Sequence, residues 1–426
     1  LSHVRSYLRF SLLNKKYVLS TISQETDLPN RAALRERLEE YSQPRLFLLK
    51  VDELESISRF YGEHTGNEIE KDIAQFLDQN CMDIFESKTA LFHLGRGLFG
   101  FLTENGPVDH SHQDDKRIAA ELLERYSRHK IEIRKVQHES SLTIVIGKQK
   151  QKIIENAELA LDAAQQNKNN VVVVDDIIEE IYQNIGDNIF WIQKIREGLI
   201  DNRFIPFFQP IRNNLTGNID KYESLVRLKS KEGEIISPFK FLKIAKNSRY
   251  YHDITRLVIS KTIDTFKTRR EQFSINLSAL DIENQEMQQF MIRKLEEVPD
   301  IASRMTFEIV EQEGFKYVDL LKQFISQVTR YGVKIALDDF GSGYSNFRTM
   351  LDMDIDYLKI DGSLIKNIDT DIASRNVVET IKTFAEKNRI KTIAEFVENA
   401  EVLKILEDMG IDYSQGYFIG KPEPEV

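Results

Sequence analysis

The sequence predicts an α/β protein in two parts, an N-terminal α+β domain followed by a modified (β/α)8 barrel. From residue 204 onward, short apolar runs of strand length alternate with helical segments, the pattern of parallel βα units. This region spans about 225 residues, which suits a single barrel. An open doubly wound sheet is the competing fold, but no glycine-rich phosphate loop follows the first predicted strand.

The N-terminal part begins with a predicted connecting helix over 1–22, where apolar residues recur at roughly helical spacing. Pro29 and Asn30 suit a turn before the next helix, at 31–41. Two apolar runs separated by Gly95-Arg96 predict a hairpin. The other helices are expected at 54–60, 66–79, 115–128 and 156–166, and the strands at 46–51, 89–94, 97–102, 142–147 and 171–174.

An amphipathic helix over 177–200 connects the two parts, with Gly186 as a candidate interruption. The predicted domains are therefore a connecting helix at 1–22, a domain at 23–176, a linker helix at 177–200 and the barrel at 201–426. Within the barrel, strands are expected at 204–211, 221–228, 272–277, 304–310, 333–338, 356–360, 390–394 and 412–416, and helices at 252–268, 286–297, 316–330, 374–388 and 399–409.

Polar residues stand within or at the ends of nearly all the predicted barrel strands. Active sites of α/β barrels lie at the C-terminal ends of the strands, so these side chains should converge on one pocket. Any single one of them could equally be a solvated strand end, but independent surface residues need not fall at successive strand ends. The set consists of Glu223, Asn276, Glu308, Asp338, Asp339, Lys359, Glu395 and Gln415.

The chemistry of this set points to divalent metal. Carboxylate and amide oxygens suit Mg²⁺ or Mn²⁺ better than Zn²⁺. Five clustered carboxylates would also repel one another strongly without cations. Two metals that share a bridging aspartate are a known solution for phosphodiester hydrolysis. Lys359 could orient the water or neutralise charge in the transition state.

The region from about 190 to 426 resembles the EAL family of cyclic-di-GMP phosphodiesterases. One motif would be weak, but the matches are several and in order. They are Phe208-Gln209-Pro210-Ile211, Glu223-Ser224-Leu225 with Arg227, Asn276-Leu277-Ser278, Phe307-Glu308-Ile309-Val310-Glu311, Asp338-Asp339-Phe340-Gly341-Ser342-Gly343-Tyr344-Ser345, Leu358-Lys359-Ile360-Asp361, Ala394-Glu395 with Val397-Glu398, and Gln415-Gly416-Tyr417.

The resemblance implies hydrolysis of cyclic di-GMP to linear pGpG by two Mg²⁺ or Mn²⁺ ions, in a protein that forms a homodimer through this domain. Glu311 would brace the loop 339–345, which in this family links the active site to the dimer interface. By this resemblance, the first metal would be held by Glu223, Asn276, Glu308 and Asp338, and the second by Asp338, Asp339 and Glu395. The catalytic residues would be Lys359, Glu395 and Glu223. The substrate-binding residues would be Gln209, Arg227 and Gln415, and Gln415 would act through the water network at the metals.

Three positions depart from the family pattern without removing a metal ligand. Leu228 replaces the usual Trp after Arg227, and Lys246 stands where an acidic residue is common. Phe396 replaces the Gly expected after Glu395. A bulky side chain there could crowd the substrate or move the neighbouring carboxylate, so activity depends on where this ring lies.

Four features of the N-terminal part form a recognisable pattern: Asp27-Leu28-Pro29-Asn30-Arg31, Tyr61-Gly62 with Gly66, the 156–174 segment and the hairpin at 95–99. On these features, residues 23–176 resemble the GGDEF family of diguanylate cyclases at the level of the fold. The family's central Gly-Gly-Asp-Glu-Phe is Gly95-Arg96-Gly97-Leu98-Phe99 here, and Lys50 stands where a metal-binding Asp is expected. Because most metal ligands are missing, we expect a degenerate domain without cyclase activity, acting as a regulatory or dimerisation module. Lys50 and Arg96 could still attract the phosphates of GTP, although a scaffold is the simpler interpretation.

Composition limits the partners and the cellular location that we expect for the protein. The chain has 58 Lys plus Arg and 68 Asp plus Glu, a net charge of −10, which argues against nucleic acid as a partner. A single cysteine fits a reducing compartment, and we expect a cytoplasmic location. No run approaches the roughly 18 apolar residues of a membrane span. Because the chain starts at Leu1 and stops at Val426, we expect a fragment, which leaves room for an inner-membrane anchor in the full-length protein.

Two other classes of function stay open on the sequence. The first is a catalytically weak or inactive receptor that binds cyclic di-GMP without turnover. The second is an adaptor that contacts protein or RNA and has lost nucleotide dependence. The clustered carboxylates argue against the adaptor, because nothing but a metal site requires them.

Overall fold

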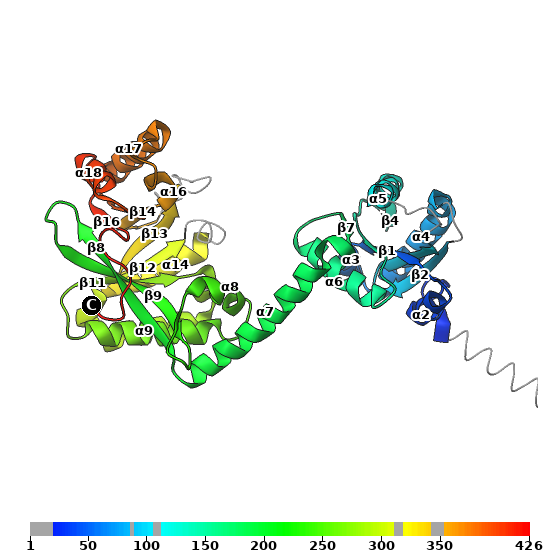
Figure 1. Ribbon diagram of the computed structural model, residues 1–426, viewed down its shortest axis with the longest axis horizontal. Helices are drawn as coiled ribbons and strands as arrows, with labels where there is room; N and C mark the ends of the chain where they lie inside the picture. The colour runs from blue at the N-terminus through cyan, green and yellow to red at the C-terminus, as the bar shows by residue number, and fades with distance from the viewer. Residues whose placement is uncertain (1–19, 86–88, 105–111, 311–317, 342–352) are drawn as a thin grey trace, which may run out of the picture. The chain divides into compact units, whose positions relative to one another are not determined.

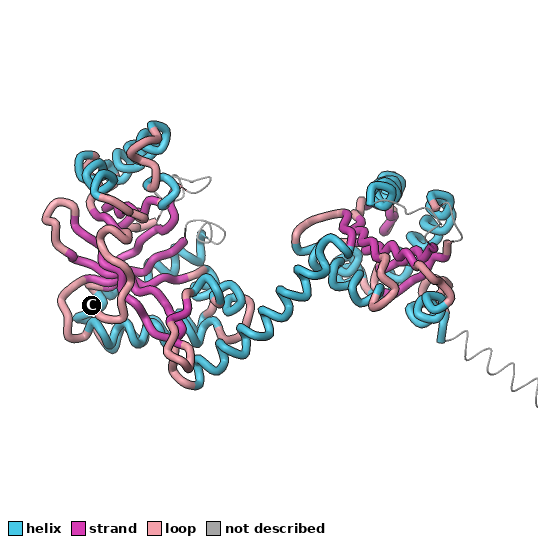
Figure 2. Tube along the Cα trace, viewed as in Figure 1, coloured by secondary structure: helices cyan, strands magenta, loops and turns pink. Residues whose placement is uncertain are grey.

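The structure is a computed structural model that describes residues 20–85, 89–104, 112–310, 318–341 and 353–426 (Figures 1 and 2). Most of the predicted helix over 1–22 therefore lies outside the described residues, as does Glu311. The chain divides into two compact units, Leu1–Asp187 and Asn188–Val426. Among the described residues, no helix combines the length and apolarity that crossing a membrane requires.

The first unit is built on a five-stranded sheet of order β2-β3-β1-β6-β7. Its central strand β1 pairs antiparallel with β3 and β6, while β7 runs parallel to β6. The strands are β1 (Pro44–Val51), β2 (Ala90–Gly95), β3 (Leu98–Glu104), β6 (Leu142–Gly147) and β7 (Val171–Val173). The helices are α2 (Arg31–Glu39), α3 (Leu54–Tyr61), α4 (Glu63–Cys81), α5 (His112–Ser127) and α6 (Ile153–Gln166), with a 3-10 turn at Met82–Ile84.

Alternate residues of β1 explain why this sheet is covered on both faces. Phe47 and Leu49 enter one apolar cluster, and Leu46 and Leu48 enter another. Successive side chains of a strand point to opposite faces, so a continuous apolar run needs packing on both sides. The sequence run that predicted a strand at 46–51 is this central strand.

One hairpin of the first unit was not predicted. Strands β4 (Ile131–Ile133) and β5 (Val136–His138) pair antiparallel around a two-residue turn. The turn residues Arg134 and Lys135 have φ of 50° and 67°, the left-handed conformation that a tight hairpin requires. Neither residue is the Asn or Gly that usually marks such a turn, so the sequence carried no signal for it.

Helix α7 (Val174–Ile200) begins in the first unit and ends in the second. It continues through Gly186, so the interruption considered at that residue is wrong. A glycine inside a helix weakens it without ending it when the residues on either side keep helical geometry.

The second unit contains a closed barrel formed by β8, β9 and β11 to β16. The sheet order is β10-β9-β11-β12-β13-β14-β15-β16-β8, and the pairing of β8 with β9 closes it. The strands are β8 (Phe204–Asn213), β9 (Ile219–Lys229), β10 (Ile235–Ile236), β11 (Gln272–Leu277), β12 (Met305–Val310), β13 (Lys334–Phe340), β14 (Tyr357–Ile360), β15 (Lys391–Ala394) and β16 (Tyr413–Gln415).

Strand β8 departs from the all-parallel arrangement that the alternating pattern predicted. It pairs antiparallel with both β9 and β16, whereas β9 and β11 to β16 are parallel to one another. Only residues 214–218 separate β8 from β9. A connection this short can form a hairpin but cannot carry the crossover that parallel strands require.

Helices surround this barrel, as Figures 1 and 2 show. They bury apolar faces in two main clusters, one that includes Phe273, Phe307 and Phe324 and one that includes Leu358, Ile381 and Leu406. The principal helices are α9 (Tyr251–Phe266), α11 (Gln285–Glu297), α14 (Val318–Val328), α17 (Ile372–Lys387) and α18 (Ala400–Asp408); shorter turns are α8 (Leu242–Lys246), α10 (Ala279–Glu283), α12 (Pro299–Ala302) and α16 (Gly362–Ile365), with 3-10 turns at Pro238–Lys240 and Thr329–Tyr331.

Candidate functional site

The site is organised around the ammonium group of Lys359, a side chain that is only 1% exposed, on β14. Its Nζ lies 2.6 Å from Glu308 Oε2 on β12 and 3.0 Å from Asp338 Oδ1 on β13. It also lies 2.7 Å from Glu395 Oε1, directly after β15, and 3.6 Å from Glu223 Oε2 on β9. Five strands thus bring together five of the residues that the sequence singled out.

Two amide side chains, those of Asn276 and Gln415, hold the carboxylate of Glu223 in place. Asn276 Nδ2 donates to Glu223 Oε1 at 2.6 Å, and Gln415 Nε2 donates to Glu223 Oε2 at 2.6 Å. Gln415 Nε2 also lies 3.1 Å from Gln209 Oε1, and Gln209 Nε2 donates to the Gly420 carbonyl at 3.2 Å. The Oε1 atom of Gln415 is buried and has no hydrogen-bond partner among the described residues, so it can accept a bond from water.

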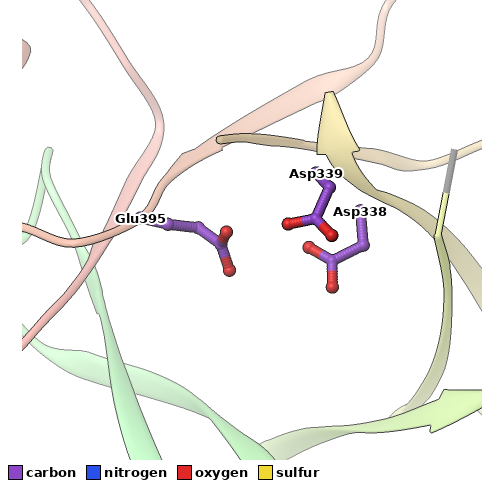
Figure 3. A group of neighbouring side chains, drawn as sticks. All are labelled: Asp338, Asp339 and Glu395. Carbon is purple, nitrogen blue, oxygen red and sulfur yellow. The ribbon is translucent and has the colours of Figure 1, made fainter. Parts of the chain in front are cut away.

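A bulge in β13 explains how two consecutive aspartates serve the same site. Neighbouring residues of a regular strand point to opposite faces. Here the register with β14 shifts between Leu337 and Phe340, and Asp339 has a φ of 56°. Bulges re-aim side chains in this way. In Figure 3 the carboxylates of Asp338 and Asp339 face that of Glu395, and oxygen atoms of the three lie within 4.8 Å of one another.

Burial and mutual repulsion oppose ionisation of several of these carboxyls. Burial raises the pKa of Glu308 to about 7, although Lys359 partly opposes the shift. Burial also raises the pKa of Glu395 well above its ordinary value, and it raises that of Asp339, helped by the charge of Asp338. The pKa of Glu223 is lowered, because Lys359 and the Gln415 and Asn276 amides outweigh its burial.

For Lys359, burial and the neighbouring carboxylates act on the pKa in opposite directions. Burial alone would lower its pKa, but the charges of Asp338, Glu223, Glu308 and Glu395 outweigh burial and raise it well above the ordinary value. These charges therefore favour the ammonium form of the side chain. One such cation cannot balance the five neighbouring carboxylates, whose hard oxygen atoms form a donor set that fits divalent cations such as Mg²⁺ or Mn²⁺.

Arg227 lies on the same strand as Glu223 and four residues further along it, so both side chains leave the same face of β9. Its Nη1 donates to the Val226 carbonyl at 2.9 Å, and the guanidinium carbon lies 5.6 Å from the centre of the Phe207 ring. Leu228 is 1% exposed in an apolar cluster with Phe204, so this departure from the family pattern serves packing.

The sequence analysis did not identify Lys221, which lies two residues before Glu223 on β9. Lys221 is 4% exposed, and its Nζ lies 3.1 Å from the centre of the Tyr357 ring. Burial lowers the pKa of Lys221 to about 7. Its spacing of two residues from Glu223 was the available signal, because that spacing places both side chains on the interior face of the strand.

In the first unit, Lys50 and Asp52, which stand at positions of the expected nucleotide and metal site, are engaged with protein groups. Lys50 Nζ lies 3.1 Å from Glu55 Oε1 and donates to the Arg96 carbonyl at 2.7 Å. Asp52 accepts hydrogen bonds from Ser141 Oγ at 2.8 Å and Thr143 Oγ1 at 2.7 Å. Leu98, at the position of a family carboxylate, is buried.

Comparisons with known proteins place these features in context. Residues 192–422 match the family model described as EAL domain, and residues 21–171 match that of the diguanylate cyclase GGDEF domain. The chain is 27% identical over 418 residues to the cyclic di-GMP phosphodiesterase PdeB of Shewanella oneidensis, covering 94% of this chain and 48% of that protein. It is 30% identical over 251 residues to the cyclic di-GMP phosphodiesterase PdeF of Escherichia coli, covering 58% of this chain and 33% of that protein.

Solved structures give the same picture of the fold. The S helix-GGDEF-EAL region of LapD from Vibrio cholerae aligns with 94% of this chain and 96% of that chain, with a TM-score of 0.52 and 18% identity, which supports the fold alone. The EAL enzyme Bd1971, in its form bound to cAMP and cyclic di-GMP, covers 67% of this chain and 79% of that chain, with a TM-score of 0.52 and 26% identity. The chain spans about half the length, or less, of the two phosphodiesterases that it matches.

Proposed function

This chain belongs to the EAL domain family, and on that premise we propose that its barrel hydrolyses cyclic di-GMP to linear pGpG. The observation that carries the proposal is the buried ammonium of Lys359 among carboxylates from four other strands. Two similar proteins bear the name cyclic di-GMP phosphodiesterase, which supports this substrate. In the reaction, water adds to one phosphorus atom and one bond from phosphorus to a ribose 3′ oxygen breaks.

Two divalent cations, Mg²⁺ or Mn²⁺, are part of the proposal. Glu223, Asn276, Glu308 and Asp338 would hold the first, and Asp338, Asp339 and Glu395 would hold the second. When bound, such ions activate water and stabilise charge on the attacking and leaving oxygens. The bulge at Asp339 supports the assignment, because it lets both aspartates face the same site.

The chain's own groups orient the reactants. Lys359 is fixed by contacts of 2.6 Å and 2.7 Å, so its positive charge would lie next to the attacking water and offset negative charge in the transition state. Arg227 would bind a substrate phosphate. Gln209 and Gln415 would complete the binding site, and the unpartnered Oε1 of Gln415 would orient water.

A chromatographic assay of cyclic di-GMP with Mg²⁺ or Mn²⁺ tests the proposal. The full chain should yield pGpG, and chelation of the metal should stop the reaction. Glu223→Ala should abolish turnover, whereas Glu234→Ala, which removes an exposed carboxylate after β9, should leave turnover unchanged. Tight binding of the dinucleotide without turnover by the folded wild-type chain would instead identify a receptor.

For the first unit, we propose a regulatory or scaffolding role without cyclase activity. The engagement of Lys50 with Glu55 and of Asp52 with Ser141 and Thr143 supports this role. Calorimetry with GTP tests it: no heat and no thermal shift are expected of a scaffold, whereas saturable binding would make the unit a nucleotide sensor. A homodimer through the barrel domain is likewise proposed, and sedimentation velocity would test it.

A further inference from the structure

Phe396 occupies a strained backbone conformation directly after Glu395. Its φ is 55°, in the left-handed region that bulky side chains rarely adopt. Such a conformation persists only where the surroundings impose it, and it occurs preferentially at functional sites. The adjoining carboxylate of Glu395 lies 2.7 Å from Lys359 Nζ, so the strain falls at the edge of the proposed active site.

Backbone hydrogen bonds on both sides impose this conformation. The N–H of Glu395 donates to the Ile360 carbonyl at 3.3 Å, and the N–H of Val397 donates to the Gln415 carbonyl at 3.0 Å. Phe396 is therefore pinned between the ends of β14 and β16. Its position is fixed by the barrel and does not depend on its own side-chain preference.

The structure also makes room for the aromatic ring. Gly362, the first residue of α16, lies under it, and a Cβ at that position would overlap the ring carbons of Phe396. Lys366 Nζ lies 5.1 Å from the ring centre. The ring is thus supported by the backbone at Gly362 and by a neighbouring cation, which limits its freedom before any ligand binds.

Despite this support, much of the ring faces solvent. Phe396 is 52% exposed, and two other exposed aromatic residues, Tyr417 and Phe418, follow β16. The N–H of Phe418 donates to the Val397 carbonyl at 3.1 Å, so the segments that carry these aromatic residues are adjacent. Exposed aromatic faces beside a strongly acidic site provide apolar area that the carboxylates cannot offer a nucleobase.

We propose that Phe396 is a specificity-determining residue whose ring stacks on a purine base of the cyclic dinucleotide. The inference rests on the proposed function and deepens it. Stacking on aromatic side chains suits any base, and the larger purine face makes more contact than a pyrimidine face. Because the ring is already held in place, little conformational freedom is lost when the base binds.

Steady-state kinetics of the full chain test this role with cyclic di-GMP and cyclic di-UMP as substrates. Phe396→Leu removes the aromatic face, so the KM for cyclic di-GMP should rise about 5- to 150-fold, the range expected for loss of one stacked base, while kcat stays within about twofold. The preference for cyclic di-GMP over cyclic di-UMP should fall. Phe396→Tyr should retain both the KM and the preference, and Phe60→Leu, which alters an exposed phenylalanine in the first unit, should change neither.

An unchanged or lower KM in Phe396→Leu would overturn the inference, and a simultaneous rise in kcat would show that the ring obstructs the site. If the wild-type chain does not turn over, the proposed function fails, but calorimetric binding of cyclic di-GMP to the same variants still tests the stacking. A circular dichroism spectrum of Phe396→Leu that matches the wild type separates loss of the stacking contact from loss of the fold.

Discussion

At the scale of single residues, Lys359 is the group on which the site depends most. It is the buried cation among carboxylates that would otherwise face one another across the barrel. Sequence patterning predicted its presence in the site, because it lies near the end of a strand. The sequence could not show that one ammonium contacts four carboxylates, since that depends on the closure of the barrel.

Replacing Lys359 with Met should therefore destabilise the metal-free chain by about 3–5 kcal/mol, the usual effect of leaving buried charges unpaired. Divalent cations should restore part of this loss, because they balance the same carboxylates. Thermal unfolding in chelator and in Mn²⁺ measures both effects, with Lys387→Met, which changes an exposed lysine at the end of α17, as the control. Equal melting temperatures for wild type and Lys359→Met in chelator would contradict this view.

Ionisation of Tyr126 should destabilise the first unit at alkaline pH. Burial raises the pKa of its hydroxyl to about 12, although a hydrogen bond of 2.7 Å with Ser140 partly opposes the shift. An unfolded tyrosine ionises near pH 10. Its stabilising contribution, about 3 kcal/mol, should therefore be fully present below pH 10 and be lost as pH rises through 12.

Cys81 allows this prediction to be measured. It is the single cysteine, it is buried in the first unit, and burial raises its pKa to about 11, so it should react with thiol reagents only when that unit opens. The rate of Cys81 labelling in the wild-type chain, divided by the rate in the unfolded chain at the same pH, should rise between pH 10 and 12. Tyr126→Phe should flatten that rise, and an equally steep rise in the variant would argue against Tyr126 as its source.

At the scale of elements, periodicity located the strands that carry the site but not all of their directions. The strand expected at 204–211 exists as β8, but it runs antiparallel because its connection to β9 is too short for a crossover. The bulge that turns Asp339 into the site also left no mark in the pattern. Both features arise from connections and pairing between strands, which a hydrophobic pattern does not encode.

Helix α7 offers a test at the same scale. Apart from the backbone of the helix itself, no described atom would lie within 4 Å of a Cβ at Gly186, so Gly186→Ala should stabilise the chain by about 0.5–1 kcal/mol through helix propensity. Gly416→Ala should instead destabilise it, because a Cβ there would overlap the Val397 backbone. Chemical denaturation followed by circular dichroism distinguishes the two, and a destabilised Gly186→Ala would show that the helix is not continuous there.

At the scale of the whole molecule, the two units have separate hydrophobic clusters and separate chemistry. The sequence predicted both fold types, because the alternation of strands and helices is strong and long. It also predicted the residues that gather at Lys359, because barrel topology brings strand ends together. The left-handed turn at Arg134 and Lys135 and the burial of Lys221 were not predicted, since each depends on packing at one position.

Part of the acidity behind the net charge of −10 is concentrated at one site in the folded chain. Four carboxylates contact Lys359 at the ends of the barrel strands, a fifth, that of Asp339, lies beside two of them, and divalent cations would balance this charge. The central question is whether that cluster adds water to a phosphodiester.

The most direct test is incubation of the full chain with cyclic di-GMP and Mn²⁺ in ¹⁸O-labelled water, followed by mass spectrometry. We expect linear pGpG that carries one ¹⁸O atom on its terminal phosphate, and no such product from Glu223→Ala. Recovery of unchanged cyclic di-GMP from the folded wild-type chain would contradict it.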